Sequence, residues 1–356
     1  MVPYILLCLL PILGSVFQRN RKKKNDGSLI WIFFIFLIVL LSLRSVKTGV
    51  DLSNYLTFFG DIAKEPFSKN WTKYGDLEIG YLFLNNVIAL FTDNSQIFLT
   101  LIAIISVLPI CCLYAKESES ALLSIAIFLI LPNFSMLFSG LRQAIAISIG
   151  AMSFYYVKKK KILPFILTIA IAYSFHRSAL VLLFLYPVYY LNITKKWLLW
   201  LLPLIAVTFI FNRQIFYVLL RFLGEKYQER YSALSVSNAY GMLILFIIFL
   251  LYAFFVPRTS SLDRETIGLR NILICSVFIQ LFAPIHAIAM RFNYYFLIFL
   301  PILIPKIVNR CQKEDALIIN FSKIVMIAFF MSYFVYNGYF GADILQVYPY
   351  IPFWVN

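Results

Sequence analysis

The chain has 356 residues, of which 62% are hydrophobic, 18% aromatic and only 13% charged, and its mean hydropathy is +0.85. A soluble domain needs far more polar residues to cover its surface, so this composition excludes a soluble domain folded around one core. The formal charge of +15, from 31 basic and 16 acidic residues, is in a membrane protein first a signal of topology and does not indicate nucleic-acid binding.

Apolar segments close to the ~20 residues that cross ~30 Å of hydrocarbon recur along the whole length. The sequence therefore predicts an all-α polytopic integral membrane protein, with residues 1–356 forming a single transmembrane domain. The first apolar run lacks a preceding basic stretch and a small-residue cleavage pattern, so a membrane helix is expected there and not a secretory signal. The predicted helices are 3–17, 29–43, 77–92, 95–114, 120–138, 140–157, 162–176, 178–191, 197–211, 239–256, 269–286, 290–305 and 316–337.

Five basic clusters set the predicted orientation, because short positively charged loops stay on the cytoplasmic side. They are Arg19–Lys24, Lys158–Lys161, Lys195–Lys196, Arg258–Arg270 and Lys306–Lys313.

The first two clusters can share a side only if an even number of spans separates them, yet five predicted helices lie between. The short, polar segment 77–92 is therefore predicted to be a re-entrant or interfacial helix on the outer side, and a break at Pro132 is the alternative. About twelve helices then cross, with both termini outside.

Two long outer loops are predicted, 44–76 and 212–238, and loops of that length in a compact bundle are usually functional. In the second, Arg213–Tyr227 has the pattern of an amphipathic helix ending near Gly224. One interpretation is an interfacial helix lying on headgroups. The other is a lid that contacts sugar rings and phosphate through Tyr217, Tyr227, Tyr231, Arg221 and Arg230.

The predicted orientation gathers ionisable and aromatic residues at the outer ends of helices or in outer loops. They are Asp51, Tyr55, Arg142, His176, Arg177, His286 and Arg291. A charged side chain at membrane depth costs roughly 2.5 to 3.5 kcal/mol. A snorkelling arginine or a capping histidine explains any one of them, but does not explain why all seven lie on one face.

Arginines beside a histidine suit a substrate with a pyrophosphate head and a lipid tail, because guanidinium forks match phosphate oxygens bidentately. A neutral histidine, or a carboxylate such as Asp51 or Glu78, can take a proton from a sugar hydroxyl. No cofactor and no metal are expected, since Asp76-Leu-Glu78 is a weak match and the five cysteines lack ligand spacing. Gly-rich phosphate loops and a Gly-x-Ser-x-Gly elbow are absent from the sequence, which excludes nucleotide and serine-hydrolase chemistry.

Six short motifs occupy these same positions. They are Gly49-Val-Asp-Leu-Ser-Asn-Tyr55, Glu78-Ile-Gly-Tyr81 with Asn85, Leu141-Arg-Gln-Ala-Ile-Ala146, Phe175-His-Arg-Ser-Ala179, Met290-Arg-Phe292 with Tyr295, and Tyr348-Pro-Tyr350. In this order, over about residues 40 to 350, the chain resembles the EpsG-type, Wzy-like bacterial polysaccharide polymerases. Arg177 stands where the family pattern is variable, so it carries less weight.

The resemblance implies a multi-pass protein of the bacterial cytoplasmic membrane with kinship to glycosyltransferases of the GT-C type. It implies that repeat units on undecaprenyl pyrophosphate, already on the outer face, are joined into an exopolysaccharide, capsule or O-antigen chain. The expected partners are this lipid-linked oligosaccharide and the lipid bilayer, with a flippase and a chain-length regulator as further candidates and no nucleic acid.

On this interpretation Arg142 and Arg291 hold the donor pyrophosphate, and His176 or Asp51 orients or deprotonates the acceptor hydroxyl. Direct attack on the anomeric carbon inverts its configuration. The other expected substrate contacts are Tyr55, Glu78, Gln143, His286, Arg221 and Tyr217.

Three alternatives differ in what they require. A lipid-linked oligosaccharide flippase needs cations deep within helices and preferably two similar halves, whereas these charges gather at one face. A ligase or another GT-C-type transferase shares the expected chemistry. A membrane O-acyltransferase with His176 as base needs access for cytoplasmic acyl-CoA, but this histidine is predicted to be outside.

Overall fold

The structure, a computed structural model, describes residues 1–18, 26–74, 77–223, 240–257, 262–310, 316–341 and 343–355. Over these ranges it is helical and contains no strand, apart from one isolated bridge between Arg44 and Pro352. The all-helical class is therefore confirmed, as expected for apolar segments that must satisfy their own backbone hydrogen bonds. The chain forms two compact units, Met1–Leu180 with Asp315–Asn356, and Val181–Glu314. A single transmembrane domain stays a prediction.

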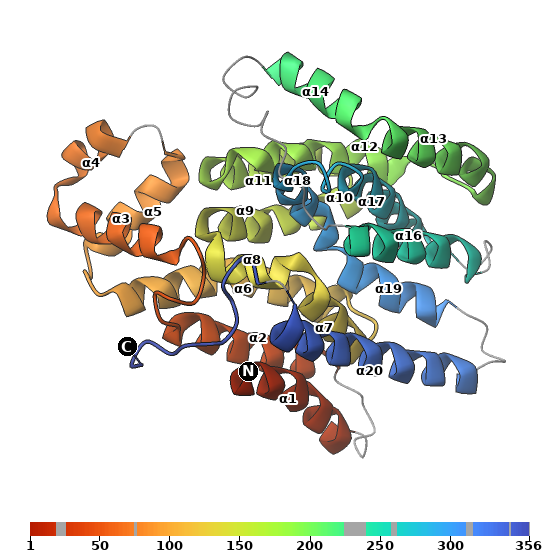
Figure 1. Ribbon diagram of the computed structural model, residues 1–356, viewed down its shortest axis with the longest axis horizontal. Helices are drawn as coiled ribbons and strands as arrows, with labels where there is room; N and C mark the ends of the chain where they lie inside the picture. The colour runs from red at the N-terminus through yellow and green to blue at the C-terminus, as the bar shows by residue number, and fades with distance from the viewer. Residues whose placement is uncertain are drawn as a thin grey trace. The chain divides into compact units, whose positions relative to one another are not determined.

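The first unit contains α1 (Val2–Gln18), α2 (Asp26–Leu43), α3 (Leu52–Lys64), α4 (Phe67–Tyr74), α5 (Ile79–Ala89), α6 (Ser95–Glu117), α7 (Ala121–Ile130), α8 (Pro132–Ser139), α9 (Leu141–Ala151), α10 (Ser153–Lys158), α11 (Ile162–Phe175) and α20 (Ala316–Phe340) (Figure 1). A 3₁₀ helix, η1 (Arg177–Phe184), follows α11. The second unit contains α12 (Leu185–Tyr190), the 3₁₀ helix η2 (Lys195–Trp197), α13 (Leu198–Ile210), α14 (Asn212–Leu223), α16 (Tyr240–Phe255), α17 (Arg264–Gln280), α18 (Ala287–Leu297) and α19 (Leu300–Asn309).

The two predicted outer loops contain helices. The prediction of a loop over 44–76 was wrong in large part, because α3 and α4 occupy most of it. Leu52, Phe59 and Ile62 are buried at helical spacing on α3, an amphipathic pattern that the mixed composition of this stretch conceals. In the second loop α14 confirms the expected amphipathic helix. Residues 224–238, with Tyr227, Arg230 and Tyr231, lie outside the described residues.

Helices α2 and α6 run antiparallel along their length and fix the two ends of the first unit. A Cβ on Gly27 would lie 3.4 Å from the carbonyl oxygen of Ala115, and at the opposite end Gln96 Nε2 donates to Ser42 O at 3.0 Å. Beyond Ala115, Glu117 pairs with Lys158 of α10 at 2.6 Å. We call the end with Glu117 and Lys158 the basic end, and the end with Ser42 and Gln96 the motif end.

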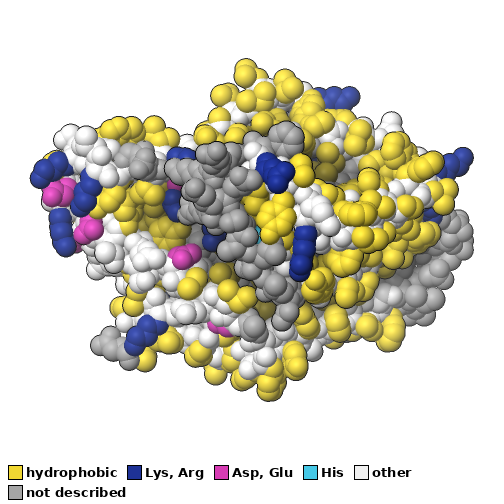
Figure 2. Space-filling view, turned by 45° about the horizontal axis from the view of Figure 1, so that its top comes forward, with side chains coloured by type: hydrophobic (Ala, Val, Ile, Leu, Met, Phe, Trp, Pro, Cys, Tyr) yellow, Lys and Arg dark blue, Asp and Glu magenta, His cyan; other side chains and the backbone are white. Residues whose placement is uncertain are grey.

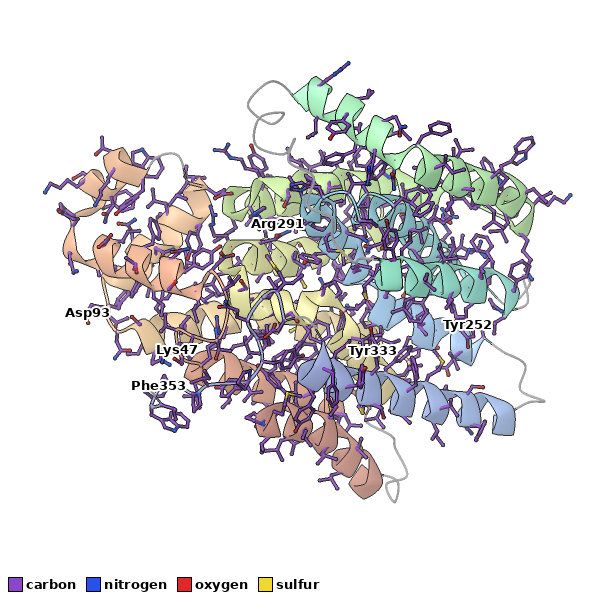
Figure 3. The ribbon with its side chains drawn as sticks, in the orientation of Figure 1. Lys47, Asp93, Tyr252, Arg291, Tyr333 and Phe353 are labelled. Carbon is purple, nitrogen blue, oxygen red and sulfur yellow. The ribbon has the colours of Figure 1, made fainter. Side chains whose placement is uncertain are left out.

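Helix α5 has both of its ends at the motif end. Glu78, which precedes α5, pairs with Arg142 at the start of α9, and Asp93 follows α5 directly before α6. Figure 3 shows Asp93 at the same end of the first unit as Lys47 and Phe353. The 11 residues of α5 extend about 16 Å, roughly half the thickness of a hydrocarbon core.

The α7–α8 pair, in contrast, joins the two ends although it bends by 64° at the break before Pro132. It begins four residues after Glu117 and ends at Ser139, whose Oγ accepts the N–H of Asp51 at 3.4 Å. The α7–α8 pair thus reaches both ends of the first unit, whereas α5 begins and ends at one. That 77–92 is the segment that does not cross stays a prediction.

By length and composition, α6 and the Asn320–Phe340 part of α20 can each cross a membrane. Three bent pairs raise this number to five among the residues that the structure describes: α7 with α8, α13 with α14, and α18 with α19. Hydrophobic side chains cover large areas of the face drawn in Figure 2, as expected of helices that contact lipid. About twelve crossings and a GT-C-like architecture stay predictions.

Gly49 provides a test of the packing at the motif end. Its φ is +118°, and a Cβ added there would lie 2.2 Å from Phe138 O, so Gly49→Ala is expected to destabilise the fold by roughly 1 to 3 kcal/mol. Gly60→Ala on α3 is the matched control, because its Cβ would meet nothing within 4 Å, and it is expected to be neutral or stabilising. Thermal unfolding in detergent measures both. Equal melting temperatures for the two variants would contradict the close contact.

Topology is tested with single cysteines in a background without the native ones. Ser53→Cys lies exposed at the start of α3, and Thr194→Cys lies exposed just before Lys195. In intact cells an impermeant thiol reagent is expected to label Ser53→Cys, and to label Thr194→Cys only after permeabilisation. Labelling of Thr194→Cys in intact cells, and of Ser53→Cys only after permeabilisation, would show that the predicted orientation is reversed.

Candidate functional site

Four of the six motifs meet at the motif end of the first unit. They contribute to one hydrophobic cluster in which Tyr81 and Leu141 are buried, with Tyr55 and Phe175 packed against it. Helices α3, α5, α9 and α11 each supply one of these residues. Segments more than 100 residues apart in the sequence therefore share one packed core beneath the polar groups of their motifs.

Arg142 lies on the first turn of α9, directly after the break at Gly140. Its Nη1 donates to Glu78 Oε2 at 2.5 Å, and the two side chains are 28% and 11% exposed. The guanidinium carbon lies 5.9 Å from the centre of the Tyr55 ring. A carboxylate and an aromatic face thus hold the guanidinium in one place while leaving it partly accessible.

Glu78 takes the N-cap position of α5, but its side chain makes no cap hydrogen bond and reaches Arg142 instead. Two residues later, a Cβ on Gly80 would lie 2.3 Å from Ser174 Oγ and 2.9 Å from Ser174 O. Only glycine permits this approach, which brings the start of α5 against the end of α11. The glutamate expected to contact substrate is therefore first the partner of Arg142.

His176 caps the helix end between α11 and η1. Its Nδ1 lies 2.6 Å from Ser178 Oγ and accepts the Ser178 N–H at 3.3 Å. Because a backbone N–H can only donate, Nδ1 is an acceptor and the proton of the neutral imidazole lies on Nε2. In this arrangement Nδ1 is already engaged, which favours an orienting role over that of general base.

Asp51 and Gln143 differ in how exposed they are. Asp51 is half-buried before α3 and its carboxylate does not cap that helix, while its N–H contacts Ser139. Gln143 is only 1% exposed, which suits packing beside Arg142 more than contact with a large substrate.

The other four predicted site residues belong to the second unit. Helix α14 packs on the turn after α17, where Phe216 stacks on His286 with ring centroids 5.9 Å apart, and Asn212 Nδ2 donates to Leu281 O at 3.1 Å. Tyr217 and Arg221, also on α14, are exposed.

His286 is the N-cap of α18, and its Nδ1 accepts the Ile288 N–H at 3.0 Å. Burial lowers the pKa of His286, and the charge of Arg291 lowers it further. Arg291 lies exposed on α18, about one turn beyond His286 (Figure 3). Both histidines of the chain therefore use Nδ1 to begin a helix.

Sequence reasoning missed three residues that shape this end of the first unit. Thr48 is fully buried and hydrogen-bonded to Ile351 in the C-terminal segment. The Ser139 hydroxyl accepts the Asp51 N–H. Arg44 is 1% exposed, and its guanidinium packs on the Phe138 ring. Arg44 lies at the end of an apolar run, as Arg142 lies at the start of one. This placement at a helix end could have indicated Arg44 from the sequence. Thr48 and Ser139 carry no sequence signal, because their partners are distant in the chain.

Within the described ranges, no group of three or more His, Cys, Asp or Glu side chains is placed to hold a metal ion. Asp76, half of the weak Asp-x-Glu match, lies outside those ranges. The described cysteines Cys8, Cys111, Cys112 and Cys275 are free thiols.

The helical fold and its apolar surface are those of a helical membrane protein. The model of the EpsG family matches residues 28–351, and the chain belongs to this family of Wzy-like polysaccharide polymerases. This confirms the resemblance seen in the motifs and implies glycosyltransferase-like chemistry. No curated protein and no solved structure matches the chain.

The Arg142–Glu78 pair provides a test of the site's stability. Glu78→Gln leaves a partly buried guanidinium without its carboxylate, which is expected to cost about 1.5 to 3 kcal/mol, the range for hydrogen bonds to charged groups. Glu65→Gln is the matched control, because its partner Lys69 is 69% exposed and such pairs contribute at most about 0.5 kcal/mol. Denaturation midpoints decide between the two outcomes, and similar values for both variants would show that the pair does not hold the site together.

Proposed function

We propose that the protein joins oligosaccharide repeat units carried on undecaprenyl pyrophosphate into an exopolysaccharide, capsule or O-antigen chain. The reaction takes place at the outer face of the bacterial cytoplasmic membrane, which the multi-pass chain spans. The observation that carries the proposal is the convergence of four family motifs around the Arg142–Glu78 pair, at the end of the first unit opposite the basic cluster of Lys158.

Arg142 recognises the pyrophosphate of the donor, the growing lipid-linked chain. Glu78 binds Nη1 and fixes the plane of the guanidinium, whose five N–H donors otherwise suit phosphate oxygens. As the glycosidic bond breaks, negative charge builds on the leaving pyrophosphate, and a cation already held in place stabilises it. In the second unit, the residues proposed to contact substrate are Arg291, Arg221, Tyr217 and His286.

The acceptor is the terminal sugar of a new lipid-linked unit. Its hydroxyl oxygen attacks the anomeric carbon of the donor, the bond from that carbon to the pyrophosphate oxygen breaks, and the configuration inverts. His176 orients the acceptor through its Nε2–H, since Nδ1 already accepts from Ser178. The hydroxyl proton passes to Asp51 or to the departing pyrophosphate. This route requires neither metal nor cofactor, and a flippase and a chain-length regulator are its proposed partners.

The test compares three variants in a strain from which the native gene has been deleted. Arg142→Lys keeps the charge but loses the fork, so polymer yield is expected to fall on the order of a hundredfold, nearly as far as with Arg142→Ala, at normal protein abundance. Arg177→Lys changes an exposed arginine next to His176 at the start of η1, and it is expected to leave the yield unchanged.

Mass spectrometry of lipid-linked glycans reads the result. Single repeat units should accumulate in the deletion strain and in both Arg142 variants. Full-length polymer from Arg142→Lys would show that Arg142 only anchors the helix at lipid headgroups. Normal polymer in the deletion strain would contradict the proposed function.

A further inference from the structure

The C-terminal segment 343–355, here the C-terminal strap, runs along the loop between α2 and α3. Ser45 N–H donates to Ile351 O at 2.7 Å, Gly49 N–H to Gln346 O at 2.8 Å, and Val50 N–H to Leu345 O at 3.0 Å. Phe353 N–H donates in return to Leu43 O at 2.8 Å. The strap thus holds residues 43–50 along nearly their whole length.

The strap is itself anchored in the core. Tyr4 donates its hydroxyl to Val347 O at 2.6 Å, and Tyr350 donates its hydroxyl to Leu40 O at 2.9 Å. The Tyr348 ring packs against Tyr4 with centroids 4.8 Å apart. The Tyr348-Pro-Tyr350 motif therefore contacts α1 and α2.

The opposite side of the same loop touches the break before Arg142. Gly49 lies so close to Phe138 O that a Cβ would come within 2.2 Å, and Asp51 N–H donates to Ser139 Oγ at 3.4 Å. Leu52 N–H then donates to Gly49 O at 3.1 Å and begins α3, which carries Tyr55 to the Arg142 guanidinium. The loop is clamped between the strap and the α8–α9 break.

We propose that the C-terminal strap positions the Arg142 site and that Thr48 is its positioning residue. The Thr48 hydroxyl accepts the Ile351 N–H at 3.1 Å and donates to Ile351 O at 3.2 Å, and the residue is fully buried. Both bonds tie the strap to the loop one residue before Gly49. Their loss frees the start of α3, and a displacement of about 1 Å at a reacting centre lowers turnover by up to a hundredfold.

The experiment uses the full-length protein in lipid nanodiscs. Thr48→Val keeps the shape and removes both hydrogen bonds, whereas Thr48→Ser keeps the hydroxyl and should rescue. Ser42→Ala is the matched control, because its hydroxyl bonds only to Ile38 O within α2 among the contacts described. Tyr350→Phe releases the strap at a second point and serves if Thr48→Val does not fold.

Two readouts are taken. Hydrogen exchange without substrate reports the amides of residues 51–56, and initial rates per folded protein with undecaprenyl-pyrophosphate-linked repeat units give kcat and KM. The kinetic arm rests on the proposed function, but the exchange arm does not.

For Thr48→Val we expect at least tenfold faster exchange over 51–56 and about tenfold lower kcat with KM within twofold of wild type. Thr48→Ser and Ser42→Ala should match wild type. Faster exchange confined to 43–50 and 345–353, with kcat unchanged, would overturn the proposal and leave the strap a local structural element. If the wild-type protein forms no polymer, that result contradicts the proposed function, and the hydrogen-exchange result alone decides the role of the strap.

Discussion

Arg142 begins an apolar helix, and a guanidinium in that position needs an anionic partner close by. Glu78 is this partner, and its Oε2 lies 2.5 Å from Arg142 Nη1. Glu78 is the N-cap of α5, a helix too short to cross a bilayer. This pairing draws the start of α5 to α9, and Gly80 then lets α5 approach the end of α11. The ion pair thus joins α5 to α9 and the close approach at Gly80 joins α5 to α11, above the packed rings of Tyr55 and Tyr81.

The sequence predicted the helices well because continuous apolar runs leave the backbone little alternative in hydrocarbon. Counting basic loops shows only that one of the five segments between the first two clusters does not cross, because a parity conflict depends on charge and segment number alone. That 77–92 is this segment stays a prediction. The helices of 44–76 were missed because α3 mixes polar and apolar residues at helical spacing. The partners of Thr48 and Ser139 were unpredictable, since Ile351 and Asp51 lie 303 and 88 residues away from them.

The two histidines have structural roles that residue type alone does not reveal. Both were expected to act on substrate, and both use Nδ1 as a helix cap, which fixes the tautomer with the proton on Nε2. A capped imidazole is a good hydrogen-bond donor, but at Nδ1 it is a poor proton acceptor. A leaving phosphate gains negative charge, and hydrogen-bond donors such as Nε2–H stabilise that charge. This arrangement therefore suits stabilisation of the departing phosphate or orientation of a hydroxyl more than deprotonation.

The first unit is discontinuous, since Met1–Leu180 and Asp315–Asn356 belong to it while Val181–Glu314 forms the second unit. During translation the ribosome therefore makes Arg142, Glu78 and the whole second unit before α20 and the strap exist. The loop that leads into α3 meets its strap partners last. A growing chain consequently carries its candidate reactive groups for most of its synthesis without the clamp that arranges them, so assembly of the site is delayed until residues 345–353 are in place.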